Sequence, residues 1–277
     1  MEINILGSGG INPPPRPGCQ CRICKEARKQ GVPYYRTGPS LFIYDESLLI
    51  NVPKDIRHQL NREDISMVEN LLIPDWRPEH NPGLSILEEL NYDFVIDAPI
   101  WDPINVYLPG RSPGQDFFGK MLGKYQSELG IIKLQEFNDC RIVQIGELNI
   151  LPVRFQSSNG FYFIIYGKGG KILYVPVRYS ELNPISEAFD ADLYIAPCMY
   201  WADKTIFRRE TTNEEIKKES SFEKMLDDAD NIRARKIVVT CIEEDFGMSY
   251  RDLKILSELK YKHWDLEFAY DGMQISL

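Results

Sequence analysis

The densest group of chemically active side chains is a cysteine cluster early in the chain. Cys19, Cys21 and Cys24 fall within six residues of a Pro- and Gly-rich stretch, whereas the other three cysteines are scattered. Thiolates at this spacing can converge on one cation, and three of them need one further donor to complete a tetrahedral zinc site. A disulfide framework is not expected in a reducing compartment. Two alternatives to zinc remain open: buried reduced thiols without metal, and an oxidised pair.

A second group of candidate ligands lies in LLIPDWRPEHNPGL, residues 71–84. This stretch holds Asp75, Glu79 and His80 in a Pro-rich loop that follows a short apolar segment, and His80 is one of only three histidines in the chain. Carboxylate and imidazole groups can bind zinc together with a thiolate. The glycine-rich residues 7–10 lack the lysine and the helix of a phosphate-binding loop, so a turn is expected there.

Short apolar segments separated by turn signals must position these residues. The pattern predicts strands at 2–7, 40–45, 47–53, 67–73, 93–97, 104–110, 140–146, 148–156, 160–167, 171–177, 193–199, 236–240 and 266–271. It predicts helices at 25–31, 54–62, 84–90, 114–128, 181–189, 214–228 and 249–259. Strands and helices occur in both halves, which favours sheets in the middle with helices outside.

Composition limits the classes of protein to consider. The 277 residues include 41 acidic and 32 basic side chains, a formal net charge of −9, which argues against general nucleic-acid binding. No apolar run is long enough to span a membrane, and MEINILGSGG lacks the features of a secretory signal. A cytoplasmic protein without membrane contact is therefore expected. No repeat or linker divides the sequence, so residues 1–277 are predicted to form one domain.

Four stretches together resemble the metallo-β-lactamase superfamily: GSGG followed by GCQCRIC, LLINVPKDIRHQLNR, TCIEEDFGMSYRDL and the ending FAYDGMQISL. The similarity is to the branch that contains the phosphoribosyl cyclic phosphodiesterase of phosphonate breakdown and the PQQ-biosynthesis B protein. It covers nearly the full chain in the same order. The resemblance implies an α/β (α+β) fold, a four-layer αββα sandwich with its active site at one edge of the two sheets.

The resemblance also implies where a dinuclear metal centre would lie. In such centres two cations lower the pKa of a bridging water and hold a substrate oxygen. The first two histidine positions fall on Pro74 and Trp76, neither of which offers a ligand atom. The aspartate and the third histidine fall on Glu79 and His80, with one residue inserted near Pro78.

The remaining ligand positions come from later strands. The resemblance places the next histidine within 156–158, the bridging aspartate on Val177 and the last histidine on Cys241. Too few metal-capable side chains remain for two cations with an open catalytic position. A vestigial pocket with Asp75, Glu79, His80 and Cys241 is therefore expected at this place.

The same branch holds one structural zinc ion on the cysteine motif. Its fourth ligand is a histidine three residues beyond the last active-site histidine, and that position is Glu244 in this chain. The expected zinc site is thus Cys19, Cys21, Cys24 and Glu244. Because a carboxylate is a harder ligand than imidazole, Cys241 and His263 are alternative fourth ligands.

Two functional hypotheses follow. The first is a catalytically silent binding or scaffold protein whose vestigial pocket takes a small molecule or a protein segment. That pocket would be made apolar by side chains from several segments: Pro74, Trp76, Trp101, Tyr200 and Trp201. The second is a phosphodiesterase-like hydrolase with a non-standard mononuclear site built from Glu79, His80, Cys241 and Asp75. The sequence predicts neither the substrate nor the oligomeric state.

Overall fold

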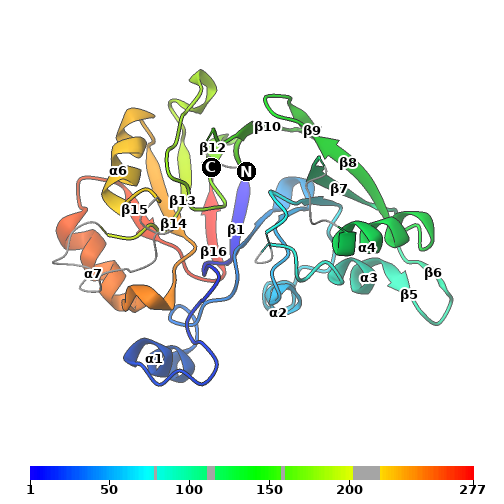
Figure 1. The fold of residues 1–277 in the computed structure, drawn as a ribbon, viewed down its shortest axis with the longest axis horizontal. Coiled ribbons are helices and arrows are strands. Elements are labelled where there is room, and N and C mark those ends of the chain that lie inside the picture. Colours follow the sequence, from blue (N-terminus) through cyan, green and yellow to red (C-terminus); the bar gives the residue numbers. More distant parts are fainter. Residues whose placement is uncertain (78–79, 111–115, 157–159, 202–218) are drawn as a thin grey trace.

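Two seven-stranded sheets stand face to face in the computed structural model (Figure 1). The structure describes residues 1–77, 80–110, 116–156, 160–201 and 219–277. The first sheet has the order β16 (Met273–Ser276), β1 (Glu2–Gly7), β2 (Ser40–Ile43), β3 (Leu48–Ile50), β4 (Asn70–Leu72), β7 (Ile104–Pro109) and β8 (Ile132–Phe137). The second has the order β15 (Leu266–Phe268), β14 (Lys236–Thr240), β13 (Leu193–Pro197), β12 (Gly170–Tyr174), β11 (Phe161–Gly167), β10 (Leu148–Arg154) and β9 (Val143–Ile145).

Helices cover the outer face of each sheet, and a small hairpin projects beside the first one (Figure 1). The described helices are α1 (Arg22–Gln30), α2 (Ile56–Arg62), α3 (Ile86–Asn91), α4 (Asp116–Ser127), α6 (Phe222–Asn231) and α7 (Tyr250–Lys260). Three 3₁₀ turns are η1 (Tyr44–Glu46), η2 (Ser186–Ala188) and η3 (Glu244–Phe246). The hairpin consists of β5 (Tyr92–Asp93) and β6 (Ala98–Pro99). None of the described helices has the length and apolarity needed to cross a membrane.

Strand β11 shows why the sequence forms two sheets with helices outside. Phe161 and Phe163 point into the core between the sheets, where they meet Ile3 of β1. Tyr162 and Ile164, which alternate with them, point into the core beneath α6 and α7. A strand buried on both faces needs a continuous apolar run rather than an alternating one. A third core joins the first sheet to α2, α3 and α4, which confirms the four-layer αββα sandwich.

Two predicted elements differ in the structure. Residues 181–189 form only the 3₁₀ turn η2, because Pro184 disfavours the helical conformation of the residue before it. Of residues 93–97, only Asp93 belongs to a strand, β5, and 94–97 form the turn of the β5–β6 hairpin, since the Asp93 carboxylate accepts hydrogen bonds from the chain two and three residues later. Of the predicted helix at 214–228, residues 214–218 lie outside the described residues, and α6 begins at Phe222.

The long loop between β1 and β2, residues 8–39, is anchored by one buried carboxylate. Asp271 Oδ1 accepts hydrogen bonds from the backbone N–H and the hydroxyl of Ser8, both at 2.8 Å. Asp271 Oδ2 accepts one from the Thr37 N–H at 2.8 Å and lies 3.4 Å from Arg62. Both ends of the loop are therefore fixed to the segment that precedes β16.

Removing this anchor should destabilise the fold strongly. We expect Asp271→Ala to lower the free energy of unfolding by about 3 kcal/mol, because it leaves several buried donors without an acceptor. Urea unfolding followed by circular dichroism measures the change. Asp227→Ala, at an exposed position on α6, is the matched control and should change stability little; equal stability of both variants would contradict the anchoring role.

Candidate functional site

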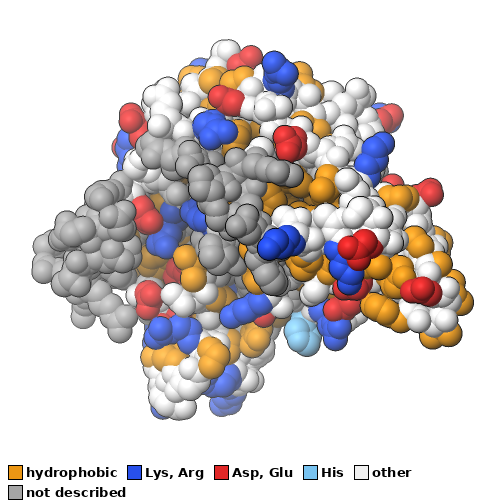
Figure 2. All heavy atoms as spheres, turned by 45° about the vertical axis from the view of Figure 1, so that its right-hand side comes forward, with side chains coloured by type: hydrophobic (Ala, Val, Ile, Leu, Met, Phe, Trp, Pro, Cys, Tyr) orange, Lys and Arg blue, Asp and Glu red, His pale blue; other side chains and the backbone are white. Residues whose placement is uncertain are grey.

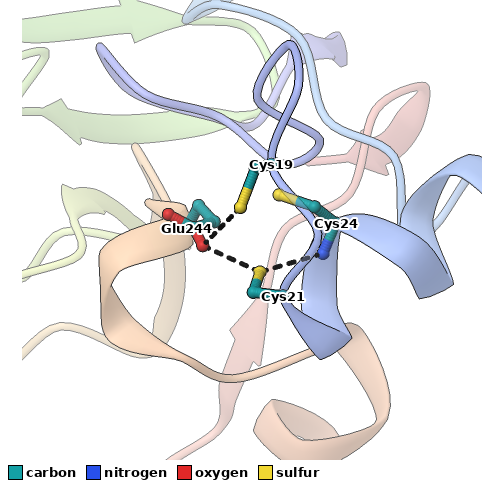
Figure 3. A group of neighbouring side chains, drawn as sticks. All are labelled: Cys19, Cys21, Cys24 and Glu244. Atoms are coloured by element: carbon teal, nitrogen blue, oxygen red, sulfur yellow. Dashed lines mark hydrogen bonds between the residues drawn. The ribbon is translucent and has the colours of Figure 1, made fainter.

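Three thiols and one carboxylate converge where the loop 8–39 meets the start of η3 (Figure 3). One ligand atom from each of Cys19, Cys21, Cys24 and Glu244 lies within 4.8 Å of the other three. Glu244 Oε1 accepts hydrogen bonds from the Cys21 thiol at 2.8 Å and the Cys19 thiol at 3.5 Å. It is the only such donor group among the described residues, and it includes Glu244, the residue to which the resemblance assigned the fourth ligand.

Local structure explains how the cluster forms. Cys21 is the N-cap of α1, and its sulfur accepts a hydrogen bond from the Cys24 N–H at 3.4 Å, as is typical of polar side chains at helix starts. The Cys24 sulfur accepts one from the Arg16 N–H at 3.3 Å. Arg16 also lies 3.0 Å from Glu244 Oε2, so its guanidinium orients the carboxylate from behind.

The surroundings affect the three thiols differently. Burial, together with the hydrogen bond to Glu244, raises the pKa of the Cys21 thiol to about 12. Burial also raises the pKa of Cys24. The backbone N–H of Cys21, followed by its side chain, lowers the pKa of Cys19 by hydrogen bonding to its sulfur. A cation would therefore have to displace the proton that the Cys21 thiol holds at neutral pH, which couples metal binding to proton release.

The donor set fits zinc. Ligand atoms around a tetrahedral Zn²⁺ with bonds of about 2.3 Å to sulfur stand about 3.8 Å apart, so atoms within 4.8 Å need only small movements. Three thiolates are soft ligands and the carboxylate is a hard one, and Zn²⁺ binds both kinds. The alternative fourth ligands lie elsewhere: Cys241 lines a separate pocket, and His263 is exposed before β15.

That separate pocket, here named the edge pocket, lies at strand ends of both sheets. It has a volume of about 120 Å³ and is lined by Gly10, Ile11, Pro39, Arg77, His80, Pro176, Val177, Arg178, Glu219, Cys241 and Glu243. His80 follows β4, Val177 follows β12 and Cys241 follows β14. The structure thus brings together three positions that the sequence assigned to one site.

His80 is held by a buried carboxylate. Its Nδ1 lies 2.6 Å from Asp75 Oδ1, and only 3% of His80 is exposed. The Arg77 Nε–H donates to Asp75 Oδ2 at 2.6 Å. Burial alone would raise the pKa of Asp75, but the hydrogen bond and charge of His80, followed by those of Arg77, hold it well below its usual range. Asp75 is therefore a partner of pocket residues and does not itself line the pocket.

Paired charges complete the lining of the edge pocket. Arg178 Nη1 lies 3.3 Å from Glu219 Oε2, and burial raises the pKa of Glu219. Glu243 accepts hydrogen bonds from the Ile11 N–H at 2.9 Å and the Asn12 N–H at 2.7 Å. Burial raises the pKa of the Cys241 thiol to about 11, so it is a protonated, weakly nucleophilic group at neutral pH.

The described part of the edge pocket does not fit a dinuclear centre. His80 and Cys241 are its only imidazole and thiol, and no three His, Cys, Asp or Glu donors of the pocket come close enough to share one cation within the described residues. Glu79, which the sequence assigned to this site, lies outside the described residues, as do positions 157 and 158. Gln156 is exposed.

The structure corrects the expected side-chain directions in the loop after β4. Trp76 packs against the core beneath α2, α3 and α4, whereas Arg77 lines the edge pocket. Asp75 and Arg77 alternate with Pro74 and Trp76, so the side chains that approach the pocket are one position later than the sequence indicated. The inserted residue inferred near Pro78 lies outside the described residues.

The pocket is also less apolar than expected. Trp201 is 2% exposed and stacks on Phe222 with ring centroids 4.9 Å apart, inside the core beneath α6 and α7. Trp101 is 61% exposed on the β5–β6 hairpin. Neither lines the edge pocket, and nor do Pro74 and Tyr200. These residues lie in the hydrophobic cores or on an unrelated surface.

Sequence reasoning missed the charged lining. Arg178 directly follows the position assigned to the bridging aspartate, and Arg77 is two residues after Asp75. An arginine directly after two of the assigned ligand positions, Trp76 and Val177, was the available signal. No sequence signal marked Glu219 and Glu243, because their approach to the edge pocket depends on the path of the chain after β13 and β14.

Comparisons with known proteins agree on the fold. No family model and no curated protein matches the sequence. Among solved structures, a diphosphatase of the PhnP family is 17% identical, with a TM-score of 0.73 over 100% of this chain and 98% of that one. Zn²⁺-bound PqqB from Methylobacterium extorquens is 17% identical, with a TM-score of 0.72 over 100% of both chains.

A third solved structure is also similar over nearly its whole length. It is the metallo-β-lactamase fold protein YhfI from Bacillus subtilis, 13% identical, with a TM-score of 0.69 over 100% of this chain and 99% of that one. Identities this low establish architecture and not activity. The chain is therefore a two-sheet α/β sandwich, and in particular it has the metallo-β-lactamase fold, as the resemblance implied.

The Asp75–His80 pair gives a pH-dependent prediction. Because the pKa of Asp75 is depressed in the folded state, its contribution to stability is present above the unfolded pKa of about 3.9 and is lost as pH falls towards the folded pKa. We expect Asp75→Asn to lower the free energy of unfolding by about 3 kcal/mol at neutral pH. Urea unfolding at neutral pH and at about pH 3 should show this difference shrinking, whereas a constant difference would contradict the assignment.

Proposed function

We propose that this protein is a catalytically silent metallo-β-lactamase-fold protein, a binding or scaffold protein that keeps one structural zinc ion. The observation that carries the proposal is that both arginines lining the edge pocket are already paired with a carboxylate. Arg77 is paired with Asp75 and Arg178 with Glu219. Two-metal hydrolysis requires several carboxylates and imidazoles free to hold cations, with an open position for water.

The zinc site supports a structural role. Cys19, Cys21 and Cys24 belong to the loop between β1 and β2, and Glu244 follows β14 of the other sheet. A zinc ion there would cross-link the two halves of the sandwich and contribute its binding free energy to folding. The backbone pairing between the Glu244 N–H and the Asn12 carbonyl, at 3.0 Å, places the two segments side by side without metal. The metal would reinforce an existing contact.

Metal analysis tests the zinc proposal. We expect about one zinc per chain in protein purified without chelator, lost in Cys21→Ser because a tetrahedral site tolerates no missing thiolate. Plasma emission spectroscopy gives the stoichiometry, and thermal unfolding should show a lower Tm for the zinc-free protein. Cys140→Ser, which changes an exposed cysteine away from the cluster, is the matched control. Metal-free wild type, or zinc retained in Cys21→Ser, would exclude the site.

The second hypothesis, a mononuclear hydrolase, has one observation in its favour. His80 and Cys241 line the same pocket, and Glu79 precedes His80 in the chain. In that case Glu79, His80 and Cys241 would hold the metal, with Asp75 orienting the imidazole of His80 as carboxylates do for metal-bound histidines.

Activity assays separate the two hypotheses. With bis(p-nitrophenyl) phosphate and p-nitrophenyl acetate, with or without added Zn²⁺ or Mn²⁺, we expect wild type and His80→Ala to hydrolyse no faster than buffer. His58→Ala, at an exposed position on α2, controls for the loss of a histidine. Metal-dependent turnover that disappears in His80→Ala and persists in His58→Ala would overturn the silent assignment and establish a hydrolase.

A further inference from the structure

The hairpin that joins α3 to β7 carries a contiguous group of exposed apolar side chains. Within residues 94–101, Phe94 is 69% exposed, Val95 92% and Trp101 61%, and Ile96 and Ile100 are also exposed. Single exposed apolar residues are normal on a protein surface, whereas a contiguous group marks an interaction site. Figure 1 shows β5 and β6 projecting at the edge of the molecule.

Hydrogen bonds hold the hairpin in one shape. At its base, the buried Asn91 accepts the Trp101 N–H at 2.7 Å and donates to the Asp102 carbonyl at 3.0 Å. At its tip, Asp93 Oδ1 accepts the Val95 N–H at 2.7 Å. These contacts fix the backbone while leaving the apolar side chains outside. A rigid apolar projection loses little conformational entropy when it binds a partner.

A cavity of about 350 Å³ lies at the base of the hairpin. Trp101, Leu90 and Met67 form its apolar wall, and the exposed carboxylates of Glu69 and Asp102 lie on its lining. No Lys, Arg or His is among the residues that line it. In Figure 2 the right-hand edge of the molecule carries hydrophobic side chains with acidic ones among them. Apolar contact and negative charge therefore meet at one place.

We propose that the hairpin 92–103 and this cavity, together named the docking surface, bind a segment of a partner protein that is both apolar and basic. Apolar side chains of the partner would cover the hairpin tip and the wall of the cavity. A lysine or arginine beside them would pair with Glu69 or Asp102 and lie against the exposed indole of Trp101, the aromatic ring that attracts cations most strongly.

The negative charge of the docking surface argues against two other occupants, a second copy of this chain and a membrane. In a dimer formed through this surface, the acidic groups of both copies would face each other, and the chain already has a net charge of −9; like charges across an interface are unfavourable. A cytoplasmic membrane surface is itself negative and attracts basic segments, so Glu69, Asp97 and Asp102 would oppose its approach. The proposal goes beyond the proposed function, because it does not depend on the chemistry of the edge pocket.

A pair of labelled synthetic peptides tests the docking surface with the full chain. One peptide contains Leu, Lys and Ser, and the other is identical except that Glu replaces every Lys. We expect fluorescence polarisation to show binding of the Lys peptide only, weakened by salt. The double variant Glu69→Gln, Asp102→Asn and the single variant Trp101→Ala should each weaken it by about tenfold or more. Circular dichroism melting checks that each variant remains folded.

Leu259→Ser, which changes an exposed leucine on α7, is the matched control and should leave binding unchanged. The proposal is overturned if both peptides bind equally or if neither binds. It is also overturned if sedimentation shows self-association that Val95→Ser abolishes, which would make a second copy the occupant. Binding to phosphatidylserine vesicles that requires Val95 and Trp101 would likewise replace the partner protein with a membrane.

Discussion

A short backbone pairing between the two sheets holds the segment after β14, which contributes residues to both candidate sites of this protein. The Ile242 N–H donates to the Ser8 carbonyl and the Glu244 N–H to the Asn12 carbonyl, both at 3.0 Å. Gly10 lies between these contacts, and a Cβ there would stand 2.3 Å from Glu243 Oε1, so a larger residue would displace the carboxylate that accepts the Ile11 and Asn12 N–H groups. Because of this pairing, Glu244 lies beside the cysteines and Cys241 lies at the edge pocket.

The two sites on either side of this pairing differ in whether their side chains would stabilise a bound cation. At the cysteine cluster, four ligand atoms already converge and a cation would satisfy them together. In the edge pocket, the guanidinium groups of Arg77 and Arg178 already supply positive charge to Asp75 and Glu219. Adding divalent cations beside two guanidinium groups would be opposed by repulsion that a partly buried site screens weakly. Under the proposed function, metal would bind at the cysteine cluster, and protein charges would take its place in the edge pocket.

Much of the fold could be predicted because its strands are buried on both faces. Continuous apolar runs such as residues 161–165 leave few alternatives to an inner strand. The cysteine spacing, with Glu244 implied by the family resemblance, led to the one convergent donor group found among the described residues. The side-chain directions after β4 could not be predicted in the same way. Whether Trp76 or Arg77 faces the pocket depends on a single-residue register in a Pro-rich loop, and no hydrophobic period specifies it.

The docking surface escaped prediction for a related reason. Residues 93–97 have an apolar composition typical of a buried strand, and nothing local distinguishes apolar side chains that face solvent from those in a core. The side-chain hydrogen bonds of Asp93 and Asn91 turn that segment outward. Glu219 was equally hidden, because its meeting with Arg178 depends on the long-range path of the chain rather than on spacing.

The central claim is that this fold holds its metal at the cysteine cluster and holds protein charges where the dinuclear centre of related folds would be. An anomalous-difference map from crystals of unmodified protein, recorded on both sides of the zinc absorption edge, tests it most directly. The account predicts one strong peak among the sulfurs of Cys19, Cys21 and Cys24 and the carboxylate of Glu244, with none in the edge pocket. A peak beside His80 and Cys241 would contradict it.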